Sequence, residues 1–321
     1  MKVAYVLARF PMLTETFILR EMLALRKLGV EVSIFSLLPP FSSPVHAQVE
    51  EMMPYVHYSP FLLSWKLWCA HFYFLFHSPL KYFRAFFKIV WETWREPDAL
   101  LGVLVLFPKS VYFARQMQEL GVDHLHAHFL WMNGISAQVM SDLTGLTFTV
   151  HPHAFGLFMR NQTDVRRQLE LAGGIVTIAE YHRRYILKLC PQLTEADVEI
   201  VHDGLDPTQF VPAHVPSTDG VVRIISIGSL IEKKGHTYLI DACSELVKRG
   251  VPFRCVIVGE GLLHASLQAQ IEKENLQEYV SLVGAKTQAE VYDLYSRSDI
   301  FVLPCVRSEE RRVGKECRSR W

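Results

Sequence analysis

Two short segments of this sequence combine glycine and lysine in a pattern that suits phosphate binding. Residues 228–235 read Gly-Ser-Leu-Ile-Glu-Lys-Lys-Gly, and residues 258–261 read Val-Gly-Glu-Gly. Glycine lets the backbone approach a phosphate closely, and lysine adds a mobile positive charge. The P-loop pattern G-x-x-x-x-G-K-[ST] is absent, and no G-x-G-x-x-G supports a nicotinamide-dependent oxidoreductase. Each segment alone also fits an ordinary solvated turn.

Four histidines form a second group with chemical potential, in His126-Ala127-His128 and His151-Pro152-His153. Four imidazoles at the ends of two strands have the ligand type of a zinc site. However, the sequence has no H-E-x-x-H and offers no clear carboxylate partner for these histidines. A D-x-D motif, which would hold a divalent metal on a diphosphate, is also absent. We therefore expect no metal and no cofactor.

The elements that must position these residues alternate between strand and helix. Residues 3–8 and 30–37 are apolar strands, and residues 14–28 between them have helical periodicity. This β-α-β opening predicts a parallel, doubly wound sheet. The proline-rich segment 206–220 predicts a linker, after which a second β-α-β series begins. Since such sheets bind ligands at the carboxyl ends of their strands, both groups lie where a site is expected.

We therefore predict an α/β protein with two Rossmann-like domains. The first covers residues 1–212 and carries an aromatic and basic helical insert near 55–113. The second covers residues 213–306. Hydrophobic residues make up 50% of the chain, which is enough for two packed cores. The formal net charge of zero excludes the basic signature of a nucleic-acid-binding protein.

The insert is rich in aromatic side chains: 15 of the 40 residues from 55 to 94 are Phe, Tyr or Trp. Its longest uncharged run, residues 67–80, is shorter than the ~20 residues that a membrane-spanning helix needs. One interpretation is an amphipathic region that lies in a membrane interface, with its cations outward. The alternative is a helical hairpin that packs its aromatic rings into the domain.

The cysteines and the N-terminal residues indicate in which cellular compartment the protein is found. The six cysteines are scattered without a C-x-x-C pair, which suits a reducing environment. We interpret residues 3–8 as a buried strand rather than as part of a signal peptide. The expected location is the cytoplasm, peripheral on the inner face of the cytoplasmic membrane.

Residues 307–321 do not fit the second domain, because they show neither strand alternation nor a helical stripe. They resemble, residue for residue, the translation of a common short-read sequencing adapter. We interpret them as an artefactual tail, the alternative being a genuine basic tail, and expect the second domain to be truncated. Without them the chain has 27 basic and 30 acidic residues.

Several segments together resemble the group 4 retaining glycosyltransferases of the GT-B fold, and among them enzymes of bacterial exopolysaccharide assembly of the colanic-acid type. No single segment is decisive, but their order and spacing are specific. The segments that carry the resemblance are residues 10–18, 126–129, 153–155, 176–180, 200–206, 228–235, 258–261 and 300–304. The resemblance covers essentially all of residues 1–306.

The resemblance implies that a nucleotide-sugar lies between the two domains, that the first domain is the acceptor side and that the second binds the nucleotide-sugar. Lys234 would neutralise the donor diphosphate without a metal, and Gly228 and Gly235 would shape its cradle. Gly261 would let the backbone approach the donor. The donor-binding residues implied in this way are Gly228, Ser229, Lys233, Lys234, Gly235, Gly259, Glu260, Gly261, Leu282 and Val283.

The resemblance also implies roles in the first domain. His153 would be the catalytic residue near the transferred sugar, and His151 is the alternative alignment. Glu15, Thr16 and His128 would lie on the acceptor side of the cleft. The acceptor would be a lipid-linked saccharide, attacked from the leaving-group face with retention of configuration.

Three departures from the family pattern qualify this assignment. Ser229 stands where family members often carry arginine, and Gly156 stands where an acid often follows His-Ala-Phe. The acidic E-x7-E segment expected after Pro304 is missing. We therefore expect the full-length parent to be a hexosyltransferase and this chain to be inactive. The alternatives are a naturally non-catalytic fragment and a GT-B sugar-nucleotide epimerase.

Overall fold

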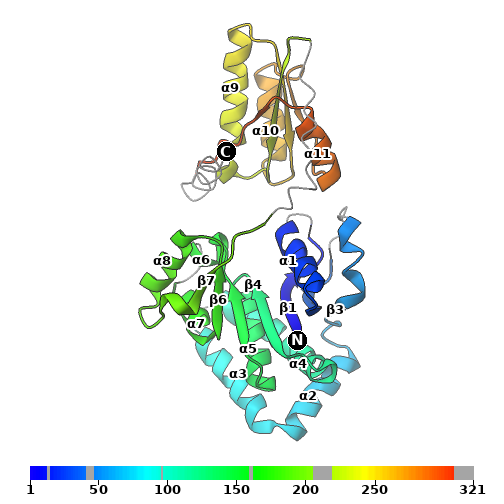
Figure 1. The fold of residues 1–321 in the computed structure, drawn as a ribbon, viewed down its shortest axis with the longest axis vertical. Coiled ribbons are helices and arrows are strands. Elements are labelled where there is room, and N and C mark those ends of the chain that lie inside the picture. The colour runs from blue at the N-terminus through cyan, green and yellow to red at the C-terminus, as the bar shows by residue number, and fades with distance from the viewer. Residues whose placement is uncertain (13–14, 41–46, 95–96, 159–161, 205–218, 307–321) are drawn as a thin grey trace. The chain divides into compact units, whose positions relative to one another are not determined.

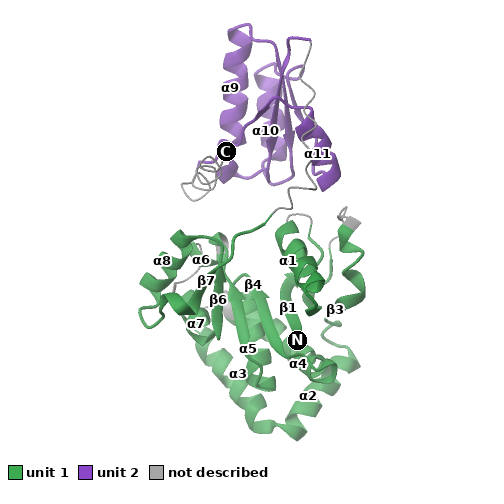
Figure 2. Ribbon diagram, viewed as in Figure 1, with its two compact units in different colours: residues 1–204 green, residues 205–321 purple. Residues whose placement is uncertain are grey.

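The computed structural model describes residues 1–12, 15–40, 47–94, 97–158, 162–204 and 219–306. The chain divides into two compact units, Met1–Gly204 (unit 1) and Leu205–Trp321 (unit 2), which Figure 2 shows in different colours. The predicted domain boundary at residue 212 and the tail 307–321 lie outside the described residues.

Unit 1 is built on a seven-stranded parallel sheet with the strand order β3-β2-β1-β4-β5-β6-β7 (Figure 1). The strands are β1 (Lys2–Arg9), β2 (Glu31–Leu38), β3 (Val56–Tyr58), β4 (His124–His128), β5 (Phe148–His151), β6 (Gly174–Thr177) and β7 (Val198–Ile200). The helices are α1 (Thr16–Lys27), α2 (Trp65–His77), α3 (Pro79–Thr93), α4 (Pro97–Leu120), α5 (Met132–Thr144), α6 (Ala154–Phe158), α7 (Gln162–Leu171) and α8 (Glu180–Leu189).

The two faces of this sheet follow from the two-residue period of its strands. In β1, Val3, Tyr5 and Leu7 belong to the core under α1, whereas Ala4 and Val6 belong to the larger core on the opposite face. All five side chains are buried, as expected for a parallel sheet covered on both faces. The face that carries Tyr5 also carries the functional side chains described below.

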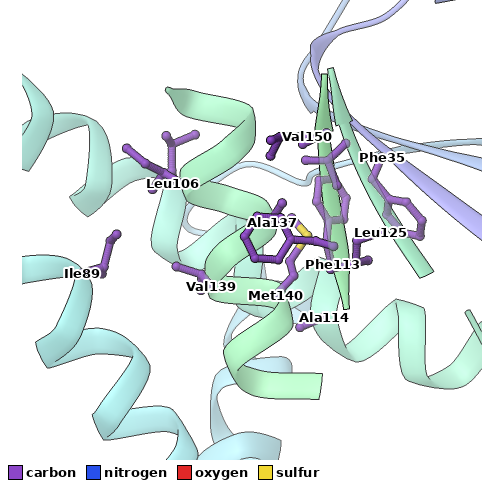
Figure 3. Packing of buried hydrophobic residues seen from close by; sticks show 14 of the residues in the cluster. Phe35, Ile89, Leu106, Phe113, Ala114, Leu125, Ala137, Val139, Met140 and Val150 are labelled. Atoms are coloured by element: carbon purple, nitrogen blue, oxygen red, sulfur yellow. The ribbon is translucent and has the colours of Figure 1, made fainter. Parts of the chain in front are cut away.

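The larger core lies between the sheet and helices α4 and α5. Phe113 of α4 packs edge-on against Phe35 of β2, with ring centroids 5.2 Å apart. Figure 3 shows this contact among residues of the sheet and of both helices. The buried residues labelled there include Leu125, Ala137, Val139, Met140 and Val150. This layer fixes β4 and β5, which carry the histidine pairs.

The predicted insert forms helices α2 and α3 and much of α4, together with the short strand β3, which the sequence did not indicate. Its inner side packs into unit 1 through buried residues such as Phe74, Ala85 and Ile89. Its outer side exposes aromatic rings on both α2 and α3. The interpretation as a helical hairpin that packs into the domain therefore describes the inner side of the insert, and the membrane-interface interpretation stays a prediction. No helix among the described residues has the length and apolar character needed to cross a membrane.

Unit 2 contains a four-stranded parallel sheet with the order β10-β9-β8-β11. Its strands are β8 (Val222–Ile227), β9 (Phe253–Val258), β10 (Val280–Leu282) and β11 (Ile300–Phe301). Its helices are α9 (His236–Lys248), α10 (His264–Lys273) and α11 (Gln288–Ser296). The predicted α/β class, with two Rossmann-like parallel sheets, is confirmed.

Candidate functional site

In unit 2 the two glycine-containing segments meet at the carboxyl edge of the sheet. The Gly228 N–H donates to the Val258 carbonyl oxygen (2.9 Å), and the Leu230 N–H donates to the Glu260 carbonyl oxygen (2.8 Å). These bonds hold the loop after β8 against the loop after β9. The third loop, after β10, joins them through the Gly259 N–H. The three loops form one continuous backbone surface.

Two glycines of this surface are required by how closely the backbones approach. A Cβ added at Gly259 would lie 2.0 Å from the carbonyl oxygen of Gly228. A Cβ at Gly235 would lie 2.0 Å from the carbonyl oxygen of Pro304, and Gly235 also has a φ of +71°. Both contacts are far shorter than van der Waals distance, so only glycine fits without moving the backbone.

Lys234 lies over the start of the first loop. It ends a single 3-10 turn, Glu232–Lys234, and helix α9 begins two residues later at His236. A Cβ added at Gly228 would lie 3.6 Å from Cδ of Lys234, so the lysine stem runs along this glycine. The ammonium group and the amino end of α9 thus belong to the same short stretch of chain, and both favour an anion.

The other predicted donor residues lie at the same edge. The Lys233 carbonyl oxygen accepts a hydrogen bond from Val306 N–H (3.0 Å), which joins this loop to the segment after β11. Leu282 ends β10, and the Val283 N–H donates to the Ile257 carbonyl oxygen (3.1 Å). Ser229 is half-buried in the first loop. The structure therefore brings together all ten residues that the sequence proposed for the donor.

In unit 1 the register of the strands brings the histidines into rows. Tyr5 of β1 pairs with His126 of β4, and His126 pairs in turn with Thr149 of β5. Two residues further along β4, His128 pairs with His151 of β5. Side chains two residues apart on a strand share a face, so His126, His128 and His151 all lie on the α1 side of the sheet.

Helix α1 adds a carboxylate to this group through Glu21. Its Oε2 lies 3.1 Å from Nε2 of His128 and 3.9 Å from Nδ1 of His151, and its Oε1 lies 3.7 Å from Nε2 of His126. The Tyr5 hydroxyl donates a hydrogen bond to Oε1 of Glu21 (2.5 Å), which favours the ionised carboxylate. We call Glu21, His126, His128 and His151 the histidine–glutamate cluster.

Burial keeps the imidazoles of His126 and His151 neutral. Desolvation is the main cause that lowers the pKa of His126 to about 3 and that of His151 to about 4, and the neighbouring His128 contributes to both shifts. His128 is completely buried. A neutral imidazole offers one nitrogen lone pair, so His126 and His151 each present a lone pair beside the Glu21 carboxylate.

His153 lies at the rim of the cluster. Its ring stacks on His151 with centroids 4.6 Å apart, and its Nε2 lies 3.4 Å from Nδ1 of His128. Phe17 and Phe129 pack against the same ring at 4.9 Å and 4.7 Å. Burial, reinforced by the neighbouring histidines, lowers the pKa of His153 to about 2. The geometry therefore suits a neutral hydrogen-bonding group held rigidly in place.

The backbone beside His153 is strained. Phe129 and Trp131 have φ values of 66° and 70°, a region that costs non-glycine residues about 1–3 kcal/mol. The Trp131 N–H donates to Oε1 of Gln168 (2.8 Å), and the Phe129 N–H donates to the His151 carbonyl oxygen (2.9 Å). Strain that is held in place by specific hydrogen bonds is typical of functional sites.

Glu15 and Thr16 stand at the start of α1, directly before Phe17. Burial raises the pKa of Glu15 to about 7. Both residues therefore lie next to Phe17 in the chain, and the Phe17 ring packs against that of His153. It gives no direct contact between Glu15 or Thr16 and the cluster itself.

Comparison with known proteins finds related sequences. Residues 211–311 match the family described as glycosyl transferases group 1. A putative colanic acid biosynthesis glycosyltransferase, WcaL of Escherichia coli K12, is 26% identical over 95% of this chain and 76% of its own length. The chain is therefore similar to group 1 glycosyl transferases over residues 211–311 and to the colanic acid glycosyltransferases over most of its length.

Solved structures agree with this assignment at the level of fold. The lipopolysaccharide outer core galactosyltransferase WaaB superposes with a TM-score of 0.59 at 15% identity, covering 95% of this chain and 74% of WaaB. Anabaena HepE, solved in complex with UDP and glucose, superposes with a TM-score of 0.63 at 13% identity, covering 96% and 75%. The sequence resemblance to GT-B glycosyltransferases is therefore confirmed.

Sequence reasoning missed one residue of the candidate site in unit 1, Glu21. A signal was present, because Glu21 follows Ile18 by three residues and precedes Met22 on the apolar side of α1, where a carboxylate is out of place. Its partners on β4 and β5 lie far along the chain. Only the fold shows that this acid meets the histidines.

Proposed function

We propose that this chain belongs to a retaining hexosyltransferase of bacterial exopolysaccharide or cell-surface polysaccharide synthesis. It moves a sugar from a nucleotide-diphosphate donor to a lipid-linked saccharide on the inner face of the cytoplasmic membrane. The observation that carries the proposal is the meeting of three loops, a lysine and a helix N-terminus at one edge of unit 2. The colanic acid relatives supply the polysaccharide context.

The donor diphosphate is neutralised by the chain itself in this proposal, with no metal at the phosphates. Lys234 supplies a full charge, and the positive end of the α9 helix dipole supplies a partial one. Both stabilise the negative charge that grows on the leaving nucleoside diphosphate. Gly259 and Gly261 let the loop after β9 pack directly against the backbone of Gly228 and Leu230, which holds the donor loops together.

His153 acts as the catalytic residue of unit 1 in this proposal. Its neutral ring donates or accepts a hydrogen bond at a hydroxyl of the transferred sugar, and its rigid packing orients the reacting centre. Glu15, Thr16 and His128 lie on the acceptor side. The acceptor hydroxyl attacks from the face of the leaving group, and a phosphate oxygen of the donor takes its proton.

The exposed aromatic side of the insert supports a membrane-bound acceptor. On α3, Leu80, Phe83, Phe87 and Trp91 are exposed at spacings of three or four residues, so they share one helical stripe. Lys81 and Arg84 are exposed on the same helix. Aromatic rings with adjacent cations suit the headgroup layer of an anionic membrane.

Donor binding tests the role of Lys234. In calorimetric titrations of the full chain with UDP-, GDP- and ADP-sugars, we expect one saturable site. Lys234→Ala should weaken it about 10- to 100-fold, because hydrogen bonds to charged groups contribute about 1.5–3 kcal/mol. The matched control is Lys248→Ala, which changes a lysine in the last turn of α9, the helix that follows the turn carrying Lys234.

Equal donor affinity in Lys234→Ala and Lys248→Ala would contradict the proposed donor site. Isomerised donor in a mixture without acceptor would indicate an epimerase rather than a transferase. Neither result depends on which acceptor the protein uses.

A further inference from the structure

The histidine–glutamate cluster has a feature that the proposed function does not explain. Four buried or half-buried groups offer one ligand atom each, and these four atoms lie within 4.8 Å of one another. The atoms are Nε2 of His126, Nε2 of His128, Nδ1 of His151 and a carboxylate oxygen of Glu21. They converge from β4, β5 and α1.

The ring nitrogens that point into the cluster have no hydrogen-bond partner. This applies to Nε2 of His126, Nε2 of His128 and Nδ1 of His151, all of which are buried. Leaving a buried polar atom unsatisfied costs about 1–3 kcal/mol, so three at one point indicate a bound ligand.

We propose that Glu21, His126, His128 and His151 bind a divalent transition-metal ion, with Zn²⁺ as the preferred occupant. Three imidazoles and one carboxylate are ligand types that Zn²⁺ takes in a tetrahedron. Bonds of about 2.0–2.1 Å place tetrahedral ligand atoms about 3.3 Å apart, so the observed separations need only small side-chain shifts. The sequence expectation of no metal rested on a missing carboxylate, which Glu21 supplies.

The groups around the cluster orient its ligands as the outer partners of metal-binding histidines do. Nδ1 of His126 lies 2.7 Å from Oγ1 of Thr149, which fixes this ring with its Nε2 toward the centre. Nδ1 of His128 lies 3.4 Å from Nε2 of His153, and Tyr5 bonds Glu21.

The proposal gives the ion a defined place in unit 1. The ion joins α1 to the carboxyl ends of β4 and β5, and one of its ligands, His128, contacts His153. The Glu21 side chain is 31% exposed, so an ion reaches the cluster from that side. The site is separate from the donor loops of unit 2.

Metal binding by the purified, tag-free full chain tests the proposal directly. After metal removal, Zn²⁺ is titrated in competition with a chromophoric chelator, and Co²⁺ is titrated while its visible absorption is recorded. We expect one ion per chain and the intense Co²⁺ bands of tetrahedral coordination. Glu21→Gln and His128→Ala should each weaken Zn²⁺ binding about 10-fold or more.

His264→Ala is the matched control, because it removes an exposed histidine of unit 2 and should leave the affinity unchanged. Glu21→Gln keeps the size of the side chain, so it guards against a variant that fails to fold. Zn²⁺ should also raise the melting temperature of the wild type more than that of Glu21→Gln. Two results would overturn the proposal: fewer than about 0.2 ions bound per chain, or equal Zn²⁺ affinity in the wild type and in Glu21→Gln.

Discussion

At the scale of single residues, the donor loops and the histidine–glutamate cluster differ in how far the sequence could predict them. The residues of the donor loops lie within short segments, each of which shows its own glycine and lysine pattern. Their common edge follows from the parallel order of β8, β9 and β10. Glu21 has no such local pattern, because what brings it to His126 and His128 is the packing of α1 on the sheet.

Gly235 allows a sharp test of the close backbone approach in the donor loops. Gly235→Ala should destabilise unit 2 by at least about 3 kcal/mol, since it combines a positive φ with a clash against the Pro304 carbonyl. Gly250→Ala is the control, because Gly250 has a φ of +67° and nothing within 4 Å of an added Cβ. It should cost about 1–2 kcal/mol.

Urea unfolding followed by far-ultraviolet circular dichroism measures this difference. Gly235→Ala should also lose nucleotide binding, whereas Gly250→Ala should keep it. If the two variants were equally stable, the approach of Gly235 to Pro304 would not be as close as described.

At the scale of elements, the alternation of strands and helices was predictable because parallel strands are apolar runs and their helices have apolar stripes. The arrangement of the insert was less predictable from the sequence. Its aromatic residues serve both faces of α2 and α3, and composition does not reveal which ring points inward. The structure separates them: Phe74 is buried, whereas Phe76, two residues on, is 80% exposed.

The exposed stripe of α3 predicts membrane binding by this element. In flotation on liposomes that contain anionic lipid, the full chain should rise with the vesicles. The triple variant Phe83→Gln, Phe87→Gln, Trp91→Gln should bind at least about tenfold more weakly, because three exposed rings no longer enter the interface. The rings are 48%, 62% and 76% exposed, so their replacement should leave folding intact.

The control for flotation changes exposed aromatic residues elsewhere. Tyr238→Gln with Tyr295→Gln in unit 2 alters rings of comparable exposure. Membrane binding should not change. A wild-type chain that stays in the soluble fraction would refute the membrane part of the proposed function.

At the scale of the whole molecule, each unit carries one half of the proposed chemistry. Unit 2 offers a cationic, glycine-lined edge for a nucleoside diphosphate. Unit 1 offers a buried set of imidazoles around His153, supported by strained backbone at Phe129 and Trp131. The fold class was predictable because two β-α-β series appear in chain order. The histidine–glutamate cluster was not, because it depends on the register between β4 and β5.

Amide hydrogen exchange of the full chain tests the central claim, that the loops after β8, β9 and β10 form the nucleotide-sugar site. Exchange is compared with and without a saturating concentration of the nucleoside diphosphate that binds best in calorimetry. We predict slower exchange in residues 228–235, 258–261 and 282–284, and loss of this protection in Lys234→Ala. Bound nucleotide with no protection in these three loops, or with protection confined to unit 1, would contradict the account.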